Sequence, residues 1–373
     1  MTENTINKIK FPYRYDIVGS FLRPEKLKQA RADLKTKKIT QKDLTKVEDQ
    51  EIKRLVNKEV ELGLKDVTDG EFRRSWWHFD FLAGLNGVHF IKTKEGYEFH
   101  NQETRREGLE INNKIAYNPN HPFFSAFKYL KQITPNTVTV KQTIPSPAML
   151  FPGEDTGIYN NYYTDFDSFL ADEIKAYQKT VQHFYDLGVR YLQLDDCGWG
   201  AWASFAKNNV LPDSLRKFAK ADVKVINAIV DNKPDDLTIT MHICRGNYES
   251  TWAFSGAYNS IADYLAQLHI NGYFLEYDDN RSGGFEPLKK IADNGRDQRV
   301  ILGLVTSKRP ELESKTLLKK RIKEASKYYP LDQLALSTQC GFSSTEEGNK
   351  LTEDQQWKKL KLVIDTAKEV WDK

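Results

Sequence analysis

Short apolar runs that are typical of buried strands recur along the chain, and most of them alternate with amphipathic stretches. The stretch Gln41–Leu62 carries its apolar side chains at helical spacing, which is typical of a helix with one buried face. The same spacing predicts helices at Asp165–Leu187, Pro212–Val230, Ser255–Leu268, Phe285–Asn294, Glu311–Tyr328 and Thr352–Trp371. The apolar runs predict strands at Tyr15–Ser20, Asp66–Phe72, Val138–Ser146, Arg190–Asp196, Leu237–Cys244, Gly272–Asp279, Val300–Ser307 and Leu334–Phe342.

Eight strands with helices between most of them indicate an α/β protein, and a (β/α)8 TIM barrel rather than an open doubly wound sheet. No Gly-x-Gly-x-x-Gly turn follows the first strand, which disfavours a dinucleotide-binding sheet. The stretch from Trp76 to Asn136 interrupts the alternation after the second strand, and His89–His100 within it alternates around Gly96 like a hairpin. We therefore predict one domain over residues 1–373, with an insertion at about 76–136 over one barrel mouth.

Residues that bind soft or borderline metals follow three of the predicted strands. His242 and Cys244 end one strand, Glu276 ends the next, and Cys340 ends the last. In a TIM barrel the carboxyl ends of the strands meet at one mouth, where the active site lies. One imidazole, two thiols and one carboxylate form a set that suits zinc, so the sequence predicts a zinc site there.

Each of these residues alone also has a structural explanation. A lone Cys340 is more often a small buried hydrophobe than a ligand, and Glu276 could be an ion-paired core residue. The same holds for polar residues at other strand ends: Asp195-Asp196 could favour a helix start, Glu71 could pair with a nearby arginine, and Gly19-Ser20 could form a turn. We interpret Cys197 as a structural thiol. The remaining histidines show no partner spacing and are interpreted as surface or core residues: His78, His89, His100, His121, His183 and His269.

Bulk properties exclude several classes of protein. The 373 residues include 55 basic and 52 acidic side chains, a net charge of +3, and no basic block with interleaved aromatic residues, so we expect no nucleic-acid partner. No run approaches the length of a membrane span, and no apolar leader opens the chain. Three widely spaced cysteines do not make a disulfide framework. We therefore predict a soluble cytoplasmic protein.

Several short motifs together resemble the catalytic half of cobalamin-independent methionine synthase, and specifically its short single-domain relatives. The resemblance runs from about Tyr15 to the C-terminus. The motifs, in the family's order, are Val18-Gly19-Ser20-Phe21, Asp69-Gly70-Glu71-Phe72, Gln193-Leu194-Asp195-Asp196, His242-Ile243-Cys244, Leu275-Glu276 and Gln339-Cys340-Gly341.

The resemblance implies a zinc-dependent methyltransferase that forms methionine from homocysteine. It places the zinc ligands at His242, Cys244, Glu276 and Cys340. It also places Ser20 near the carboxylate of homocysteine, and Glu71 and Asp195 near its ammonium group. The implied partners are two small molecules, homocysteine and a methyl donor.

The donor is less well defined, because the full-length enzymes carry a histidine near the end of strand seven that is thought to protonate the leaving folate. This chain has Thr306 in that segment, which cannot do so. The candidate donors are therefore a methyltetrahydrofolate, a corrinoid or a sulfonium compound, and the last two leave without needing that acid.

Three other readings remain open from the sequence. One is a zinc-dependent alkyl transfer to a different thiol such as coenzyme M. Another is a metal-free barrel such as a porphyrinogen decarboxylase, which would not need the cysteine pair. A third, outside enzymes, is a barrel with a structural zinc, although such sites usually have four His or Cys ligands.

Overall fold

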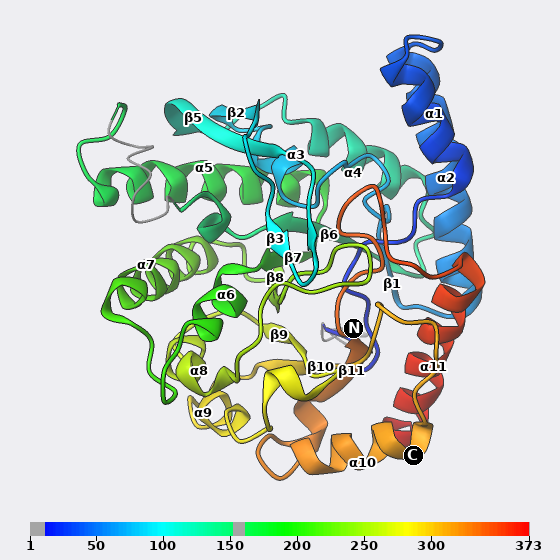
Figure 1. Ribbon diagram of the computed structural model, residues 1–373. Helices are drawn as coiled ribbons and strands as arrows, with labels where there is room; N and C mark the ends of the chain where they lie inside the picture. The colour runs from blue at the N-terminus through cyan, green and yellow to red at the C-terminus, as the bar shows by residue number, and fades with distance from the viewer. Residues whose placement is uncertain (1–11, 152–160, 373) are drawn as a thin grey trace, which may run out of the picture.

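A seven-stranded parallel sheet forms the centre of the molecule, in the order β1-β6-β7-β8-β9-β10-β11. We describe residues 12–151 and 161–372 of a computed structural model. The sheet curls into a barrel-like half-cylinder in Figure 1, which agrees with the predicted α/β barrel class. The strands of this sheet are β1 (Asp66–Val67), β6 (Thr139–Pro145), β7 (Tyr191–Asp196), β8 (Thr238–Ile243), β9 (Gly272–Glu276), β10 (Arg299–Val305) and β11 (Leu334–Thr338).

Helices surround the sheet on its outer face (Figure 1). They are α1 (Glu25–Lys35), α2 (Gln41–Leu62), α5 (Phe166–Leu187), α6 (Gly198–Ser204), α7 (Asp213–Val230), α8 (Ala262–Leu265), α9 (Leu288–Ala292), α10 (Lys315–Ala325) and α11 (Glu353–Trp371). Short 3-10 turns lie at Pro147–Leu150, Tyr258–Ser260, Asn280–Ser282 and Leu331–Gln333. All seven helices predicted from the spacing contain helical structure, although Ser255–Leu268 holds only a 3-10 turn and the four residues of α8.

Local signals define the ends of the longest helices. Thr40 caps α2 through a capping box with Asp43, and Gly63 ends it in the left-handed conformation at φ 91°. Asp165 caps α5 and Gly188 ends it in the same way, at φ 102°. Such caps satisfy backbone groups at the helix ends, which is why the ends of these helices could be predicted to within one residue.

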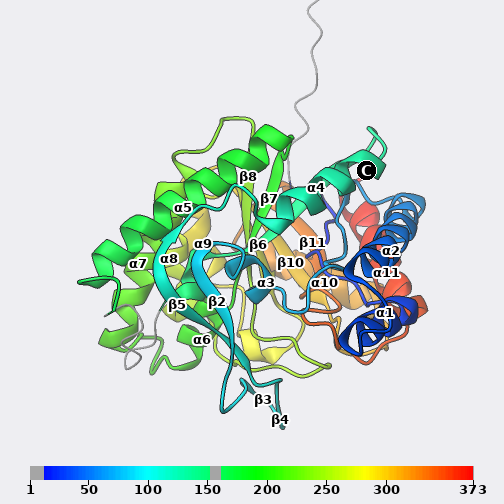
Figure 2. The ribbon, with the colours of Figure 1, turned by 90° about the horizontal axis from the view of Figure 1, so that it is seen from above.

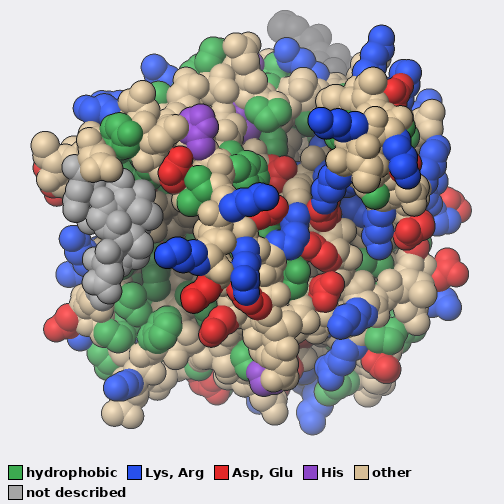
Figure 3. Space-filling model, turned by 45° about the horizontal axis from the view of Figure 1, so that its top comes forward, with side chains coloured by type: hydrophobic (Ala, Val, Ile, Leu, Met, Phe, Trp, Pro, Cys, Tyr) green, Lys and Arg blue, Asp and Glu red, His purple; other side chains and the backbone are tan. Residues whose placement is uncertain are grey.

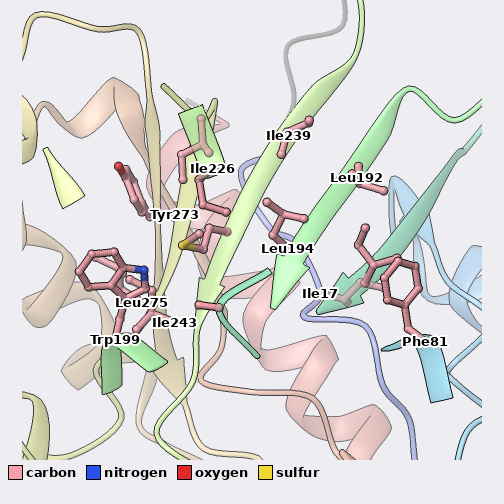
Figure 4. Packing of buried hydrophobic residues seen from close by; sticks show 14 of the residues in the cluster. Ile17, Phe81, Leu192, Leu194, Trp199, Ile226, Ile239, Ile243, Tyr273 and Leu275 are labelled. Atoms are coloured by element: carbon pink, nitrogen blue, oxygen red, sulfur yellow. The ribbon is translucent and has the colours of Figure 1, made fainter. Parts of the chain in front are cut away.

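The core lies between the sheet and the helices. Leu192 and Leu194 of β7 and Ile239 of β8 are fully buried, and Ile226 of α7 packs toward the neighbouring strands (Figure 4). A fully buried Leu or Ile side chain stabilises a fold by about 1.5–3 kcal/mol. The strands are buried on both faces, so their sequences are continuous apolar runs. These runs made the strands predictable.

The first predicted strand, Tyr15–Ser20, is wrong as a strand. Only Tyr15 forms a single parallel bridge, to Leu336 of β11. The backbone carbonyls that follow accept hydrogen bonds from side chains instead of from a strand: Ile17 from Lys141, Val18 from Gln193 at 2.6 Å, and Gly19 from Thr68 at 2.6 Å. The segment therefore lies between β11 and β1 and occupies the place of an eighth strand, with the single bridge at Tyr15 as its strand pairing.

The second predicted strand, Asp66–Phe72, ends early. Only Asp66–Val67 pairs, with β6. Gly70 and Glu71 both have positive φ, 65° and 60°, and the Asp69 carboxylate accepts the Glu71 N–H at 2.8 Å. Positive φ is uncommon for a residue other than glycine and occurs often at functional sites. The other six predicted strands are present, most of them ending a few residues before the predicted limit.

The segment 76–136 contains α3 (Phe79–Leu82), β2 (Asn86–Lys92), β3 (Glu98–Phe99), β4 (Gln102–Glu103), β5 (Glu107–Ala116) and α4 (Pro122–Ile133). The hairpin predicted around Gly96 has the wrong partners. His89 of β2 pairs with Glu110 of β5, and β3 pairs with β4 in a smaller hairpin. Figure 2 shows β3 and β4 projecting at one end of the molecule. The His100 N–H donates to the Trp252 carbonyl at 2.8 Å, which ties this hairpin to the loop that follows β8.

The surface has no dominant charge on the face drawn in Figure 3, where Lys and Arg side chains are interspersed with Asp and Glu. Among the described residues, none of the helices combines the length and the apolar character needed to cross a bilayer.

Candidate metal and substrate site

The carboxyl ends of β8, β9 and β11 bring together His242, Glu276 and Cys340. One ligand atom from each lies within 4.8 Å of the others, and all three residues are buried. These residues are far apart in sequence, and the parallel register of the sheet aligns the strand ends that carry them. Among the described residues, no other group of three or more His, Cys, Asp or Glu side chains has this geometry.

Cys244 lies just beyond the end of β8, next to this group. Its Sγ atom lies 3.8 Å from Sγ of Cys340. The two thiols are therefore close enough to share one ion after a small adjustment of side chains. Contact with Cys197, and after it burial, raises the pKa of the Cys244 thiol well above its ordinary value. Contact with Cys244, and after it burial, does the same for the pKa of Cys340.

Glu276 contributes a carboxylate with one free oxygen. Oε1 accepts the backbone N–H of Arg245 at 2.9 Å, whereas Oε2 is buried and has no hydrogen-bond partner. A buried carboxylate oxygen without a partner is costly unless a cation neutralises it. Lys308 Nζ lies 3.9 Å from Oε2 but also pairs with Asp278 at 3.2 Å. An imidazole, two thiols and an unpartnered carboxylate oxygen therefore fit a zinc ion chemically.

Asp195 lies behind His242. The two side chains are 3.2 Å apart between Oδ1 and Nδ1, and Gln193 also donates to the same oxygen at 2.7 Å. Burial alone would lower the pKa of His242, but the hydrogen bond to Asp195 and the nearby Cys340 raise it to about 9. A carboxylate that accepts from one ring nitrogen fixes the orientation of a histidine, a common arrangement behind metal ligands.

Glu71 is buried and partly neutralised. Its Oε1 lies 3.1 Å from Arg74 and accepts from the Thr143 hydroxyl at 2.9 Å, whereas Oε2 is buried without a partner. Burial raises the pKa of Glu71 to about 7 against the opposing effect of Arg74.

Ser20 lies against the loop that follows β11. Its Oγ accepts the Ser343 N–H at 3.2 Å. A Cβ on Gly341 would come within 2.0 Å of that oxygen, so this close approach requires glycine.

A cavity of about 270 Å³ joins these residues. Six of the seven predicted site residues line it: Ser20, Glu71, Asp195, His242, Cys244 and Cys340. Glu276 is fully buried and is not part of the lining. The structure therefore places all seven at one mouth, with the candidate metal ligands at its floor.

Two of the lining residues had been assigned other roles from the sequence. Cys197 was interpreted as a structural thiol, yet it lines the cavity and contacts Cys244. His78 was assigned to the surface or the core; it is buried but also lines the cavity, and burial lowers its pKa to about 3. For Cys197, the adjacent Asp195-Asp196 pair at a strand end was an available signal. Thr306 is not in the lining, and its backbone N–H donates to Glu313 at 2.9 Å.

Comparisons with known proteins agree on one family. The family model described as "Cobalamin-independent synthase, Catalytic domain" matches residues 15–369. The uncharacterized protein YxjH of Bacillus subtilis is 47% identical over 99% of this chain and 97% of its own length. A methionine synthase of Pyrococcus horikoshii is 22% identical over 87% of this chain and 85% of its own length.

Solved structures give the same result. A putative vitamin-B12-independent methionine synthase from Listeria monocytogenes is 38% identical, with a TM-score of 0.76, over 96% of this chain and 98% of that chain. A B12-independent methionine synthase from Shewanella, solved with selenomethionine, shares the fold at 17% identity and a TM-score of 0.70, over 96% of this chain and 98% of that chain. The resemblance deduced from the sequence motifs is thus confirmed. The chain belongs to the family of cobalamin-independent methionine synthase catalytic domains.

Proposed function

We propose that this protein transfers a methyl group to the thiol of homocysteine, forming methionine, with one zinc ion held by His242, Cys244, Glu276 and Cys340. The observation that carries the proposal is the buried convergence of His242, Glu276 and Cys340 within 4.8 Å, with Cys244 beside them. The family and the methionine synthase relatives support the same activity.

Zinc, when bound, supplies a Lewis acid that keeps a substrate thiol deprotonated and nucleophilic at neutral pH. The protein residues hold and orient the groups around it. Asp195 fixes the His242 ring through the 3.2 Å contact at Nδ1, and the Arg245 N–H holds one oxygen of Glu276. Both contacts restrict the ligands to one arrangement, which lowers the entropy lost when an ion binds.

Ser20, Glu71 and Asp195 would bind the amino-acid end of homocysteine. The unpartnered Oε2 of Glu71 can accept a hydrogen bond from the substrate ammonium group. Ser20 can donate its hydroxyl hydrogen to the substrate carboxylate, since the Ser20 oxygen accepts from Ser343 and its hydrogen stays available. With its ammonium and carboxylate groups held in this way, homocysteine would direct its thiol toward the cavity floor. This positioning accelerates transfer.

Transfer to coenzyme M is disfavoured by the same carboxylates. That thiol carries an anionic sulfonate in place of an ammonium group. Glu71 and Asp195 both line the cavity and would repel it when ionised. A purely structural zinc is disfavoured because the four candidate ligands line or underlie an open cavity and include a carboxylate.

Substitution of one sulfur ligand tests the proposal. We expect wild-type protein to hold one zinc per chain, and Cys340→Ser to lose both zinc and methyl transfer. The loss of activity should be at least about 100-fold, since changing even outer-shell partners of a metal typically costs about 10- to 100-fold. Zinc content by mass spectrometry and methionine formation from homocysteine are the two measurements.

Cys197→Ser provides a matched cysteine control that should keep its zinc. Cys197 contacts Cys244 but is not a proposed ligand. A Cys340→Ser protein with full zinc content and full activity would contradict the proposal.

A further inference from the structure

Aromatic side chains form much of the cavity wall above the candidate metal ligands. Trp76, Trp77 and Tyr97 come from the segment 76–136 on one side, and Tyr248 and Phe254 come from the loop after β8 on the other. Phe99 of β3 bridges the two sides, with its ring centroid 5.5 Å from that of Tyr248. Rings of this kind attract cations through their faces.

The lining carries three acidic side chains. Glu71 and Asp195 lie toward the floor, and Glu98 of β3 lies at the exposed rim. Among the described residues that line this cavity, none is lysine or arginine. His78 is neutral at physiological pH because burial lowers its pKa to about 3.

Arg245, which follows the lining residue Cys244, is buried over the Tyr258 ring and donates to the Gly256 carbonyl. Two other arginines just outside the lining are engaged with carboxylates. Arg74 pairs with Glu71 at 3.1 Å. Arg105 lies over the Trp76 ring at 4.8 Å and pairs with Glu346 at 2.9 Å and with Glu347 at 2.7 Å. These contacts leave neither guanidinium free to bind an anion inside the cavity.

We propose that the methyl donor is an onium compound, a sulfonium or a quaternary ammonium, whose positive charge lies against this aromatic wall. The inference rests on the proposed methyl transfer to homocysteine and specifies its second substrate. A methyl-bearing cation matches both the aromatic rings and the carboxylates. A folate, with its glutamate carboxylates, would meet acidic groups and no lysine or arginine in the lining.

The reaction balances without any further reactant. The homocysteine thiol loses its proton to solvent on binding, and the thiolate sulfur forms a bond to the methyl carbon. The bond from that carbon to the donor's sulfonium sulfur or ammonium nitrogen breaks, and its electron pair stays on the departing atom. The leaving group is then a neutral thioether or tertiary amine, which needs no proton from the protein.

The test is a donor panel with homocysteine and the zinc-loaded enzyme. S-methylmethionine and dimethylsulfoniopropionate represent sulfonium donors, glycine betaine represents quaternary ammonium donors, and methyltetrahydrofolate triglutamate and methylcobalamin represent the alternatives. In parallel, calorimetry measures the binding of tetramethylammonium, a probe that cannot be confused with turnover of homocysteine. We expect methionine from at least one onium donor and measurable binding of the probe.

Two variants of lining residues, each with a matched control, test whether the donor's charge lies against this wall. Trp77→Leu should lower kcat/KM for the onium donor about tenfold, because a cation loses one ring face. Trp371→Leu on α11 is the matched control and should change it little, because this indole lies outside the lining, where it donates to the Leu331 carbonyl at 2.9 Å and contacts Arg14. Glu98→Lys should lower the same constant several-fold at low salt, whereas Glu110→Lys, exposed on β5 and outside the lining, should not.

The outcomes separate this inference from the proposed function. Methionine formed only from the folate or the corrinoid, with no binding of the probe, would overturn the onium donor and leave homocysteine methylation standing. Methionine from the sulfonium arm or from the ammonium arm would support the inference and identify the source. No methionine from any donor and no probe binding would overturn both.

Discussion

At the scale of single residues, the site depends on carboxylates whose charge is set by their surroundings. Glu71 is the clearest example, since its main chain is left-handed at φ 60° and its side chain is buried between Arg74 and Thr143. Strained backbone of this kind is retained where a side chain must point in one direction. In Glu71 that direction is into the cavity shared with Asp195 and His242.

The pKa of Glu71 predicts a pH dependence. Burial raises this pKa from 4.5 to about 7, so the carboxyl group gains its negative charge as the pH rises through 7. We expect kcat/KM for homocysteine to rise with pH across that range, because the ionised form accepts the ammonium hydrogen bond. Glu71→Gln should remove this step and lower kcat/KM by about 10- to 100-fold, given that a hydrogen bond to a charged group contributes about 1.5–3 kcal/mol.

Glu313→Gln is a control on a residue outside the lining, where the carboxylate accepts from Thr306 and pairs with Lys359. It should keep the wild-type pH profile. An unchanged profile in Glu71→Gln would rule out this role for the Glu71 carboxylate.

At the scale of elements, the segment 14–21 occupies the place of a strand but is held largely by hydrogen bonds from side chains. Lys141 of β6 is the centre of this arrangement, since its ammonium group bonds to the Ile17 carbonyl and pairs with Asp16 at 2.8 Å. Both partners of the ion pair are fully buried. The Tyr191 hydroxyl also donates to Asp16 at 2.8 Å.

Removal of the Lys141 charge should therefore be strongly destabilising. Lys141→Met leaves Asp16 buried without its cation, and breaking a buried pair in this way costs about 3–5 kcal/mol. Lys26→Met removes an exposed partner of Glu51, and such surface pairs contribute about 0–1 kcal/mol. Urea unfolding of both variants measures the difference, and equal losses of stability would show that the segment is held by other contacts.

This segment also explains how far the fold was predictable. The parallel strands β6 to β11 are buried on both faces, so their apolar runs identify them. The place of the first strand depends on Lys141, Gln193 and Thr68, which lie about 50 to 175 positions away and leave no local pattern. The pairing of β2 with β5 was missed for a related reason, since alternation indicates strands but not which strand is the partner.

The candidate site was more predictable than the insertion over it. Strand ends in a parallel barrel meet at one mouth, so residues at those ends could be placed together from sequence position alone. His78 and Cys197 lie outside the strands, and their place in the cavity follows from the folding of the segment 76–136 and of α6. No periodicity in the sequence carries that information.

At the scale of the whole molecule, the curled sheet and the segment 76–136 supply different parts of the cavity. The sheet brings candidate metal ligands from β8, β9 and β11 to one floor, and the segment supplies the aromatic side of the cavity above them. The hairpin β3–β4 is attached to the loop after β8 through His100, which bonds to Trp252 and stacks on its ring at 4.7 Å. The floor of the cavity and much of its aromatic wall are therefore built by separate parts of the chain.

X-ray absorption at the zinc edge, recorded before and after addition of homocysteine, tests the central claim most directly. We expect one zinc per chain bound by the sulfur atoms of Cys244 and Cys340 together with nitrogen and oxygen. Homocysteine should then add one further sulfur, because its thiol joins the site. A protein without stoichiometric zinc, or a spectrum whose sulfur count does not change with homocysteine, would contradict the account.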